Sequence, residues 1–286
     1  ESTVGSYSYT VEATYMISAG SFSAVIVDKL QVQSYTTSDA RADVNSNVNI
    51  DVLVWFDYDN TPCTTATLTI NGYSATHQGS GVYRITRTSS TVTSVTYNTV
   101  AASAESTYGI TTVDQNGQST TVVWDRVKIL TKGVTEYRVD VSSSTTVYFT
   151  ACYEFDSVSF DNTKGTLYID GTAATWQNSR WERTVSQSTM GLRYYQPSSV
   201  DDTTYGLTVI NQYAGSQAAL WDNLPTAATQ LTPAQNTWFN MPTSVQFTWT
   251  FNDPNTGEGD HQTAFRLQID NNDNFASPEH DTGKVT

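Results

Sequence analysis

The chain is poor in several residue types on which large classes of proteins depend. Of its 286 residues 5 are Lys, 3 are Met and 2 are Cys, and Asp and Glu outnumber Lys and Arg by 28 to 14. The net charge of −14 repels nucleic acid and anionic lipid, so we expect neither as a partner. Two cysteines, Cys63 and Cys152, are too few for a disulfide scaffold, and we expect free thiols.

Long apolar runs and recognisable catalytic motifs are also missing. No stretch approaches the roughly 20 apolar residues that a membrane span requires. There is no Gly-rich phosphate loop and no Gly-x-Ser-x-Gly nucleophile elbow. The three histidines, His77, His261 and His280, lie in unlike contexts without the spacing of metal ligands. We therefore expect no membrane span, and we expect that the protein is not an enzyme.

The abundant residues favour strands. Thr, Val and Tyr supply 91 of the 286 residues, and β-branched and aromatic side chains prefer extended backbone. No segment shows helical periodicity, whereas Asn-Gly at 71–72 and Asp-Gly at 170–171 lie between alternating segments, as in tight hairpins. The sequence therefore predicts an all-β protein.

Several short motifs recur at a spacing of 97 residues. Val-Asp-Lys-Leu begins at residue 27, Trp-Asp-Arg-Val at 124 and Trp-Asp-Asn-Leu at 221, and Thr-Tyr-Gly-Ile and Thr-Tyr-Gly-Leu begin at 107 and 204. A fixed spacing of this kind is typical of tandem repeats. It divides the chain into a partial repeat (1–29), a first repeat (30–126), a second repeat (127–224) and a region of a different type (225–286).

The strand signals within each repeat predict an immunoglobulin-like β-sandwich, since about seven short strands fall within one repeat length. We thus expect tandem sandwiches with incomplete domains at both ends of the chain. No Gly-, Pro- or Ser-rich spacer separates Trp124 from Val127, so the repeats should form a stiff rod. Asp28, Asp125 and Asp222 stand at the joints, where a carboxylate can cap backbone N–H groups of a turn.

The motifs of the second repeat resemble a known type of domain. Thr-Leu-Tyr-Ile-Asp-Gly at 166–171, Trp176, Trp181, the run at 204–211 and Trp-Asp at 221–222 resemble Ig-like repeats found in tandem in very large archaeal and bacterial cell-surface or secreted proteins. The segments 247–254, 265–270 and 281–285 resemble a fibronectin type III-like domain of prokaryotic extracellular proteins. The resemblance implies an extracellular or cell-surface location and leaves the function open, because such modules have many roles.

The terminal regions 1–29 and 225–286 are shorter than a complete sandwich. A sandwich that lacks strands exposes apolar interior and unpaired strand edges. Either the sequence is cut from a longer chain, or a neighbouring subunit supplies the missing strands.

Acidic residues give the first candidate site. Asp57 and Asp59 on one loop, and Glu154 and Asp156 on another, follow long apolar strands at the same 97-residue offset. Two carboxylates two residues apart can both face one hard cation, which predicts calcium. The region 225–286 offers a second acidic set at Asp253, Glu258, Asp260 and residues 270–273. The alternative is that these acids cap turns and contact solvent.

Aromatic residues give the second candidate site. Trp176 and Trp181, with Tyr194 and Tyr195, could form a platform on which a sugar stacks. The alternative is that these side chains belong to the core, as alternating aromatics in strands usually do. The first repeat has His77 and Tyr83 in place of the two tryptophans, so the repeats would not be equivalent binders.

These features favour a structural role over catalysis. The leading hypothesis is a non-enzymatic segment of a large extracellular protein, such as a cell-surface stalk, surface layer or filament. Its partners would be copies of itself, joined through exposed strand edges, or neighbouring surface proteins. The alternative is an adhesin or a carbohydrate-binding accessory module of a secreted enzyme, with glycans as partners.

Overall fold

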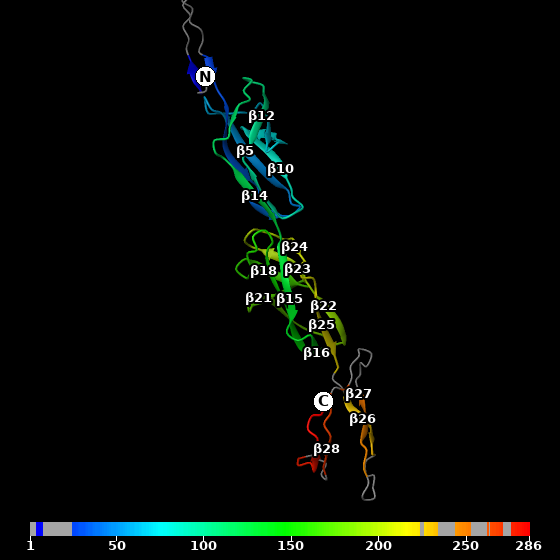
Figure 1. Cartoon of the computed structure of the whole chain (residues 1–286). Coiled ribbons are helices and arrows are strands. Elements are labelled where there is room, and N and C mark those ends of the chain that lie inside the picture. The colour runs from blue at the N-terminus through cyan, green and yellow to red at the C-terminus, as the bar shows by residue number, and fades with distance from the viewer. Residues whose placement is uncertain are drawn as a thin grey trace, which may run out of the picture. The chain divides into compact units, whose positions relative to one another are not determined.

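The computed structural model describes residues 4–7, 25–223, 226–233, 244–252, 262, 264–270 and 276–286. Every regular element in these residues is a β-strand, so the all-β prediction is confirmed (Figure 1). No helix that could span a membrane occurs in this part of the chain. Parts of both terminal regions lie outside the described residues, and the expectation of incomplete domains there stays a prediction.

The chain divides into two compact units. The first comprises Glu1–Lys132, Phe149–Glu182 and Gln196–Ser216, and the second comprises Gly133–Tyr148, Arg183–Tyr195 and Gln217–Thr286. These bounds differ from the repeat boundaries read from the sequence, so the domain division stays a prediction.

Strands of the first repeat form three sheets. The largest has the order β13-β3-β5-β10-β9, with β6 also pairing with β5; its strands are β3 (Leu30–Thr37), β5 (Val48–Phe56), β6 (Thr61–Pro62), β9 (Thr76–Gly79), β10 (Val82–Arg87) and β13 (Val113–Asp114). The second, β11-β14-β4, contains β4 (Arg41–Asp43), β11 (Thr93–Tyr97) and β14 (Thr120–Asp125). The third, β12-β7-β8, contains β7 (Ala66–Ile70), β8 (Tyr73–Ser74) and β12 (Val100–Glu105).

The three sheets share one apolar core. Alternate residues of β5 from Val48 to Phe56 are buried, as the period of a strand requires. The two smaller sheets contribute Leu68, Ile70 and Trp124 to the same buried cluster. Sheets that face each other across a common core make an immunoglobulin-like β-sandwich, as the sequence predicts.

Strands of the second repeat pair in the same orders. The sheets are β20-β21-β17-β15-β24, β16-β25-β22 and β19-β18-β23. Their strands are β15 (Val127–Val134), β16 (Arg138–Asp140), β17 (Ser144–Tyr153), β18 (Gly165–Ile169), β19 (Thr172–Ala173), β20 (Thr175–Gln177), β21 (Arg180–Ser186), β22 (Gly191–Tyr195), β23 (Pro197–Asp202), β24 (Ile210–Asn211) and β25 (Gln217–Asp222).

The motif at the end of each repeat recurs because its tryptophan has the same buried position in both repeats. Trp124 and Trp221 are buried, and each indole N–H donates to a backbone carbonyl 78 residues earlier, on Ser46 at 3.1 Å and on Ser143 at 3.0 Å. A buried indole needs such a partner, and the partner is held at the same offset in both repeats.

Cys63 and Cys152 are free and buried, and burial raises the pKa of both thiols.

The remaining described strands form three pairs outside these sheets. They are β1 (Gly5–Tyr7) with β2 (Val25–Val27), β26 (Thr226–Thr232) with β27 (Thr248–Asn252), and β28 (Gln268–Ile269) with β29 (His280–Asp281). The region resembling a fibronectin type III-like domain is described only in part, and its assignment stays a prediction.

Candidate functional site

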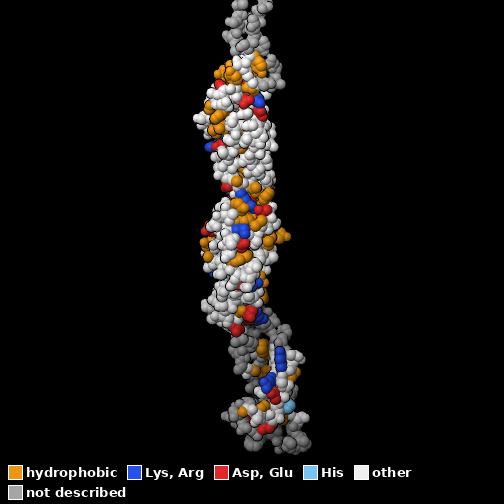
Figure 2. Space-filling model, turned by 90° about the vertical axis from the view of Figure 1, so that its left-hand side faces the viewer, with side chains coloured by type: hydrophobic (Ala, Val, Ile, Leu, Met, Phe, Trp, Pro, Cys, Tyr) orange, Lys and Arg blue, Asp and Glu red, His pale blue; other side chains and the backbone are white. Residues whose placement is uncertain are grey.

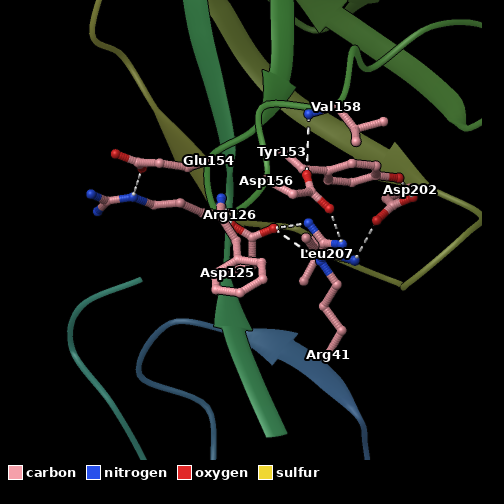
Figure 3. Close-up of polar contacts among 10 residues, drawn as sticks. Arg41, Asp125, Arg126, Tyr153, Glu154, Asp156, Val158, Asp202 and Leu207 are labelled. Atoms are coloured by element: carbon pink, nitrogen blue, oxygen red, sulfur yellow. Dashed lines mark hydrogen bonds and ion pairs between the residues drawn. The ribbon is translucent and has the colours of Figure 1, made fainter. Parts of the chain in front are cut away.

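The first repeat continues into the second without a spacer. β14 ends at Asp125 and β15 begins at Val127, so Arg126 alone separates the two strands. Side chains from residues 41–43, 125–126, 153–156 and 202–209 gather here, all within the first compact unit. Figure 3 shows part of this cluster around Arg41. We call this cluster the Arg41 joint.

Arg41 binds two carboxylates at the centre of the joint. Its Nε and Nη2 donate to Oδ2 of Asp125 at 3.0 and 2.5 Å, and its Nη1 donates to Oδ2 of Asp156 at 2.8 Å. The side chain of Arg41 is 10% exposed and that of Asp125 is 0% exposed. Burial disfavours the charge on Arg41, but hydrogen bonds to Asp156 and Asp125 outweigh it and raise the guanidinium pKa. The bond from Arg41 lowers the pKa of Asp156.

Three aromatic rings of the second repeat surround the Arg41 guanidinium. Its Cζ lies 4.3 Å from the ring centroid of Tyr205, 4.6 Å from that of Tyr153 and 5.9 Å from that of Phe155. A planar guanidinium packs well on aromatic faces, and desolvation strengthens the attraction. Because Arg41 belongs to β4, it ties a strand of the first repeat to loops of the second.

A buried acid anchors the loop that carries Tyr205. Asp202 is 5% exposed and accepts a hydrogen bond from the Tyr153 hydroxyl at 2.8 Å. It also accepts from the backbone N–H groups of Thr204 at 3.0 Å and Leu207 at 3.2 Å. Asp202 thus fixes two of the rings that contact Arg41.

Glu105 does the same for the equivalent loop of the first repeat, 97 residues earlier. It is 5% exposed and accepts from the backbone N–H groups of Thr107 at 2.7 Å, Tyr108 at 2.7 Å and Gly109 at 3.1 Å. The recurrence of Thr-Tyr-Gly at 107 and 204 therefore reflects one loop built twice around a buried carboxylate.

A second carboxylate of β4 crosses the joint beside Arg41. Asp43 accepts from the backbone N–H groups of Thr208 at 2.9 and 3.0 Å and of Val209 at 3.1 Å, and from the Thr208 hydroxyl at 2.7 Å. Charge-assisted bonds of this kind are stronger than neutral ones. β4 therefore holds the second repeat through both an arginine and an aspartate.

The capping role predicted for the joint aspartates is confirmed. Asp28 accepts from the Tyr58 N–H at 2.9 Å, and Asp125 accepts from the Phe155 N–H at 2.9 Å, again 97 residues apart. Asp222 accepts from the N–H of Asn223 at 2.8 Å and pairs with Arg138.

The residues predicted to bind calcium all have partners within the protein. Asp57 lies 3.6 Å from Lys29 Nζ, and Asp59 accepts from the Thr61 N–H and hydroxyl at 3.1 and 2.6 Å. Glu154 accepts from Arg126 Nε at 2.5 Å and from the Asn211 amide at 3.0 Å. Burial works against ionisation of Glu154, but these bonds outweigh it and lower its pKa.

The two acids of each pair therefore point to different partners rather than to one shared point. No group of three or more His, Cys, Asp or Glu that could hold a metal occurs among the described residues. Of the second acidic set, Asp253, Glu258, Asp260 and residues 271–273 lie outside the described part. Calcium at Asp57, Asp59, Glu154 and Asp156 stays a prediction, and at the last two it would have to displace Arg126 and Arg41. A fall in melting temperature on adding a chelator would support it.

The predicted sugar platform needs correction at two of its four residues. Trp181 is 2% exposed and donates its indole N–H to the Phe160 carbonyl at 2.8 Å, so its faces are not available to a ligand. Tyr195 is 6% exposed and packs on Trp221 at a centroid distance of 6.2 Å. Trp176 is half-buried against Trp181, with ring centroids 5.3 Å apart, and Tyr194 is 63% exposed. Ligand binding at Trp176 stays a prediction.

Replacing Glu105 should make stability less sensitive to acid. Burial works against the charge, but hydrogen bonds from Thr65 and the backbone outweigh it and lower the pKa of Glu105 from 4.5 to about 2. Folding lowers the pKa of this carboxyl, so its ionised form stabilises the folded state at pH values above the unfolded pKa. This stabilisation is lost as the pH falls from about 4.5 to about 2. Glu105→Gln should therefore lower stability by about 2 kcal/mol at pH 7 and flatten the melting temperature between pH 5 and pH 2. Thermal melts of Glu136→Gln, an exposed site, provide the control and should follow the wild type.

Arg41, Asp43 and Tyr205 are not among the functional residues predicted from the sequence. One signal was present, because Arg-Ala-Asp at 41–43 recurs as Arg-Val-Asp at 138–140, at the 97-residue spacing. On the face shown in Figure 2, charged side chains are sparse and basic groups lie beside acidic ones.

No protein-family model matches the chain, and no curated protein matches it at a significant level. Among solved structures, the chain is similar to the Escherichia coli adhesin FdeC, with 14% identity over 77% of this chain and 74% of that one and a TM-score of 0.32. It is also similar to the Yersinia pseudotuberculosis adhesin InvE, with 11% identity over 71% of this chain and 66% of that one and a TM-score of 0.25. The chain is similar as well to fibronectin(III)-like modules of Clostridium thermocellum CbhA, with 13% identity over 65% of this chain and 92% of that one and a TM-score of 0.29. These values are too low to transfer a function to this chain.

Proposed function

We propose that this chain is a non-enzymatic structural segment of a large extracellular protein, in which Arg41 locks one Ig-like repeat onto the next. The observation that supports the proposal is the Arg41 joint. A guanidinium from one repeat is buried between a carboxylate of its own repeat, a carboxylate of the next, and three aromatic rings. Stalks, surface layers and filaments need repeats that do not bend freely, and self-association through strand edges is part of the proposal.

The chemistry of the joint suits a permanent mechanical role. Side chains of the first repeat contact loops of the second through charge-assisted bonds from Arg41 and to Asp43, and the connecting residue, Arg126, is itself paired with Glu154. Each partner is fixed by a further bond, as Asp202 fixes the Tyr205 loop. Such mutual restraint limits hinge motion more than a short connection alone can.

The proposal is tested by measuring how widely the two repeats sample different separations. Spin labels are placed at Thr88→Cys and Ala173→Cys, two exposed positions within the first compact unit, while the native thiols are buried. The wild type should give one narrow distance distribution, and Tyr205→Ala should broaden it because a ring against Arg41 is lost. Tyr108→Ala removes the equivalent tyrosine from the first repeat and is the matched control. A broad distribution in the wild type would contradict a locking role for the joint.

A further inference from the structure

The first repeat contains a pocket of a size suited to a small ligand. Its volume is about 310 Å³, at the lower end of the range of about 300 to 1,000 Å³ that is usual for such sites. Its walls come from the start of β8, the end of β10, the loop that joins β10 to β11, and from β11 and β14. Its lining includes Tyr73, Arg87, Thr88, Ser89, Thr93 and Trp124, and we call it the Arg87 pocket. The first repeat alone builds this pocket, within the first compact unit.

Arg87 is the one charged residue in the lining of the pocket. None of the lining residues is Asp or Glu, although the chain has 28 of them. Within the described part of the chain no carboxylate pairs with Arg87, whereas Arg41 and Arg84 each bind at least one. Acids outnumber bases two to one in this chain, so an arginine without a carboxylate partner is an exception. Its guanidinium is left to pair with an anionic group from outside the described chain.

An aromatic ring positions the Arg87 guanidinium. Its Cζ lies 3.6 Å from the ring centroid of Tyr73, which is 44% exposed. Burial raises the pKa of the Tyr97 hydroxyl, and the positive charge of Arg87 close by opposes this rise. A guanidinium stacked on a ring keeps its edge for hydrogen bonds, and a planar carboxylate fits that edge with two parallel bonds. Arg87 is therefore placed to receive a carboxylate.

Hydroxyl groups lie in the lining beside Arg87. They belong to Thr88, Ser89 and Thr93, and those of Thr88 and Thr93 have no hydrogen-bond partner among the described residues. A carboxylate alone, such as the end of a peptide, would leave these hydroxyls unmatched. A sugar ring supplies hydroxyls that can donate to them and accept from them, and an apolar face that can pack on a tyrosine. The composition of the pocket thus favours a sugar that carries a carboxylate.

The second repeat does not reproduce the stacked pair of Arg87 and Tyr73. Thr172 follows the Asp-Gly turn where Tyr73 follows the equivalent Asn-Gly turn. Val185 takes the place of Arg87 near the end of β21 and is 6% exposed. A buried valine cannot pair with an anion, so the stacked arginine is particular to the first repeat, and the second repeat provides an internal reference.

We propose that the Arg87 pocket binds a sugar that carries a carboxylate, as a uronic acid does. The Arg87 guanidinium pairs with the carboxylate, and the hydroxyls of Thr88 and Thr93 bind hydroxyls of the sugar. The ring of the sugar packs against the exposed part of Tyr73. This binding site goes beyond the proposed structural function, because none of the contacts of the Arg41 joint depends on it.

The test records NMR spectra of the ¹⁵N-labelled wild-type chain during a titration with glucuronate. The indole N–H of Trp124, a residue in the lining, should shift with a Kd of about 1 to 10 mM. The indole N–H of Trp221, its counterpart in the second repeat, should stay in place. Glucose has the same ring without the carboxylate, and it should bind at least about tenfold more weakly because the charge-assisted bonds are lost.

Variants identify the group that recognises the carboxylate. Arg87→Gln should weaken glucuronate binding at least about tenfold and leave the affinity for glucose unchanged. Arg84→Gln is the matched control, because it removes an arginine of the same strand that pairs with Asp51, and the titration should follow the wild type. Tyr73→Ala is a second variant, at an exposed site, in case Arg87→Gln perturbs its loop; it removes the ring that positions Arg87 and should also weaken binding.

Five results would overturn the inference. They are no shift of Trp124 at about 50 mM glucuronate, equal binding of glucose, equal shifts of Trp124 and Trp221, unchanged binding by Arg87→Gln, and binding of an acetylated peptide with a free carboxyl end as tight as that of glucuronate. The last result would assign the pocket to peptide ends instead of sugars. The spin-label distances across the Arg41 joint do not depend on the titration, so its failure with a narrow distance distribution contradicts this inference alone.

Discussion

Replacing Arg41 with Ala should destabilise the first compact unit by about 3–5 kcal/mol at neutral pH. The change leaves Asp125, whose side chain is 0% exposed, without its cation, and an unpaired buried carboxylate is strongly unfavourable. It also removes the guanidinium from between the rings of Tyr153 and Tyr205. Amide hydrogen exchange checks the result: the N–H of Phe155, which donates to Asp125, should lose protection.

Two further variants separate the buried charge from ion pairing in general. Arg84 donates twice to Asp51 at 2.6 Å on the strand surface and is 38% exposed, so Arg84→Ala should lower stability by less than about 1 kcal/mol. Adding Asp125→Asn to Arg41→Ala should restore part of the loss, because the uncompensated charge is gone. If Arg41→Ala and Arg84→Ala had equal effects, the joint would be an ordinary surface contact.

The fold was predictable because it depends on signals that are local or repeated. Thr, Val and Tyr dominate the strands, and alternation along β5 from Val48 to Phe56 is visible in the sequence itself. Trp124 and Trp221 are buried at positions 97 residues apart, and their spacing is one of the signals from which the sequence predicts tandem repeats. The capping by Asp28 and Asp125 followed from a position at the end of a strand, which a sequence shows directly.

The joint was not predictable by the same means, because its partners are far apart in the chain. Arg41 lies 84 residues before Asp125 and 115 before Asp156, and nothing local to Arg41 distinguishes it from a solvent-exposed strand residue. The partners of the acidic pairs were not predictable for the same reason. The spacing of these acids suits calcium, but the sequence does not show that Arg126 is placed against Glu154 or Arg41 against Asp156. Arginine can satisfy a carboxylate as well as a metal does, and only the fold decides between them.

Replacing Gly165 with Ala should destabilise the protein by about 3 kcal/mol and loosen the Arg41 joint from a distance. A Cβ at Gly165 would overlap the backbone carbonyl oxygen of Asp201, and backbone cannot move aside as a flexible side chain can. Gly165 is paired with Asp202 across β18 and β23, so the displacement reaches the acid that anchors the Tyr205 loop. We therefore expect lower thermal stability and faster hydrogen exchange at the Leu207 N–H, which donates to Asp202.

Gly171→Ala is the matched control, because it changes a glycine of the same repeat that has space around it. A Cβ there meets nothing within 4 Å, and the left-handed backbone, with φ of +75°, accounts for the expected loss of about 1 kcal/mol. Gly171 follows β18 at its far end from Gly165, so the Leu207 N–H should keep its protection. If Gly171→Ala were as destabilising as Gly165→Ala, backbone strain alone would explain both, and the close approach of β23 to Gly165 would have no special part in holding the joint.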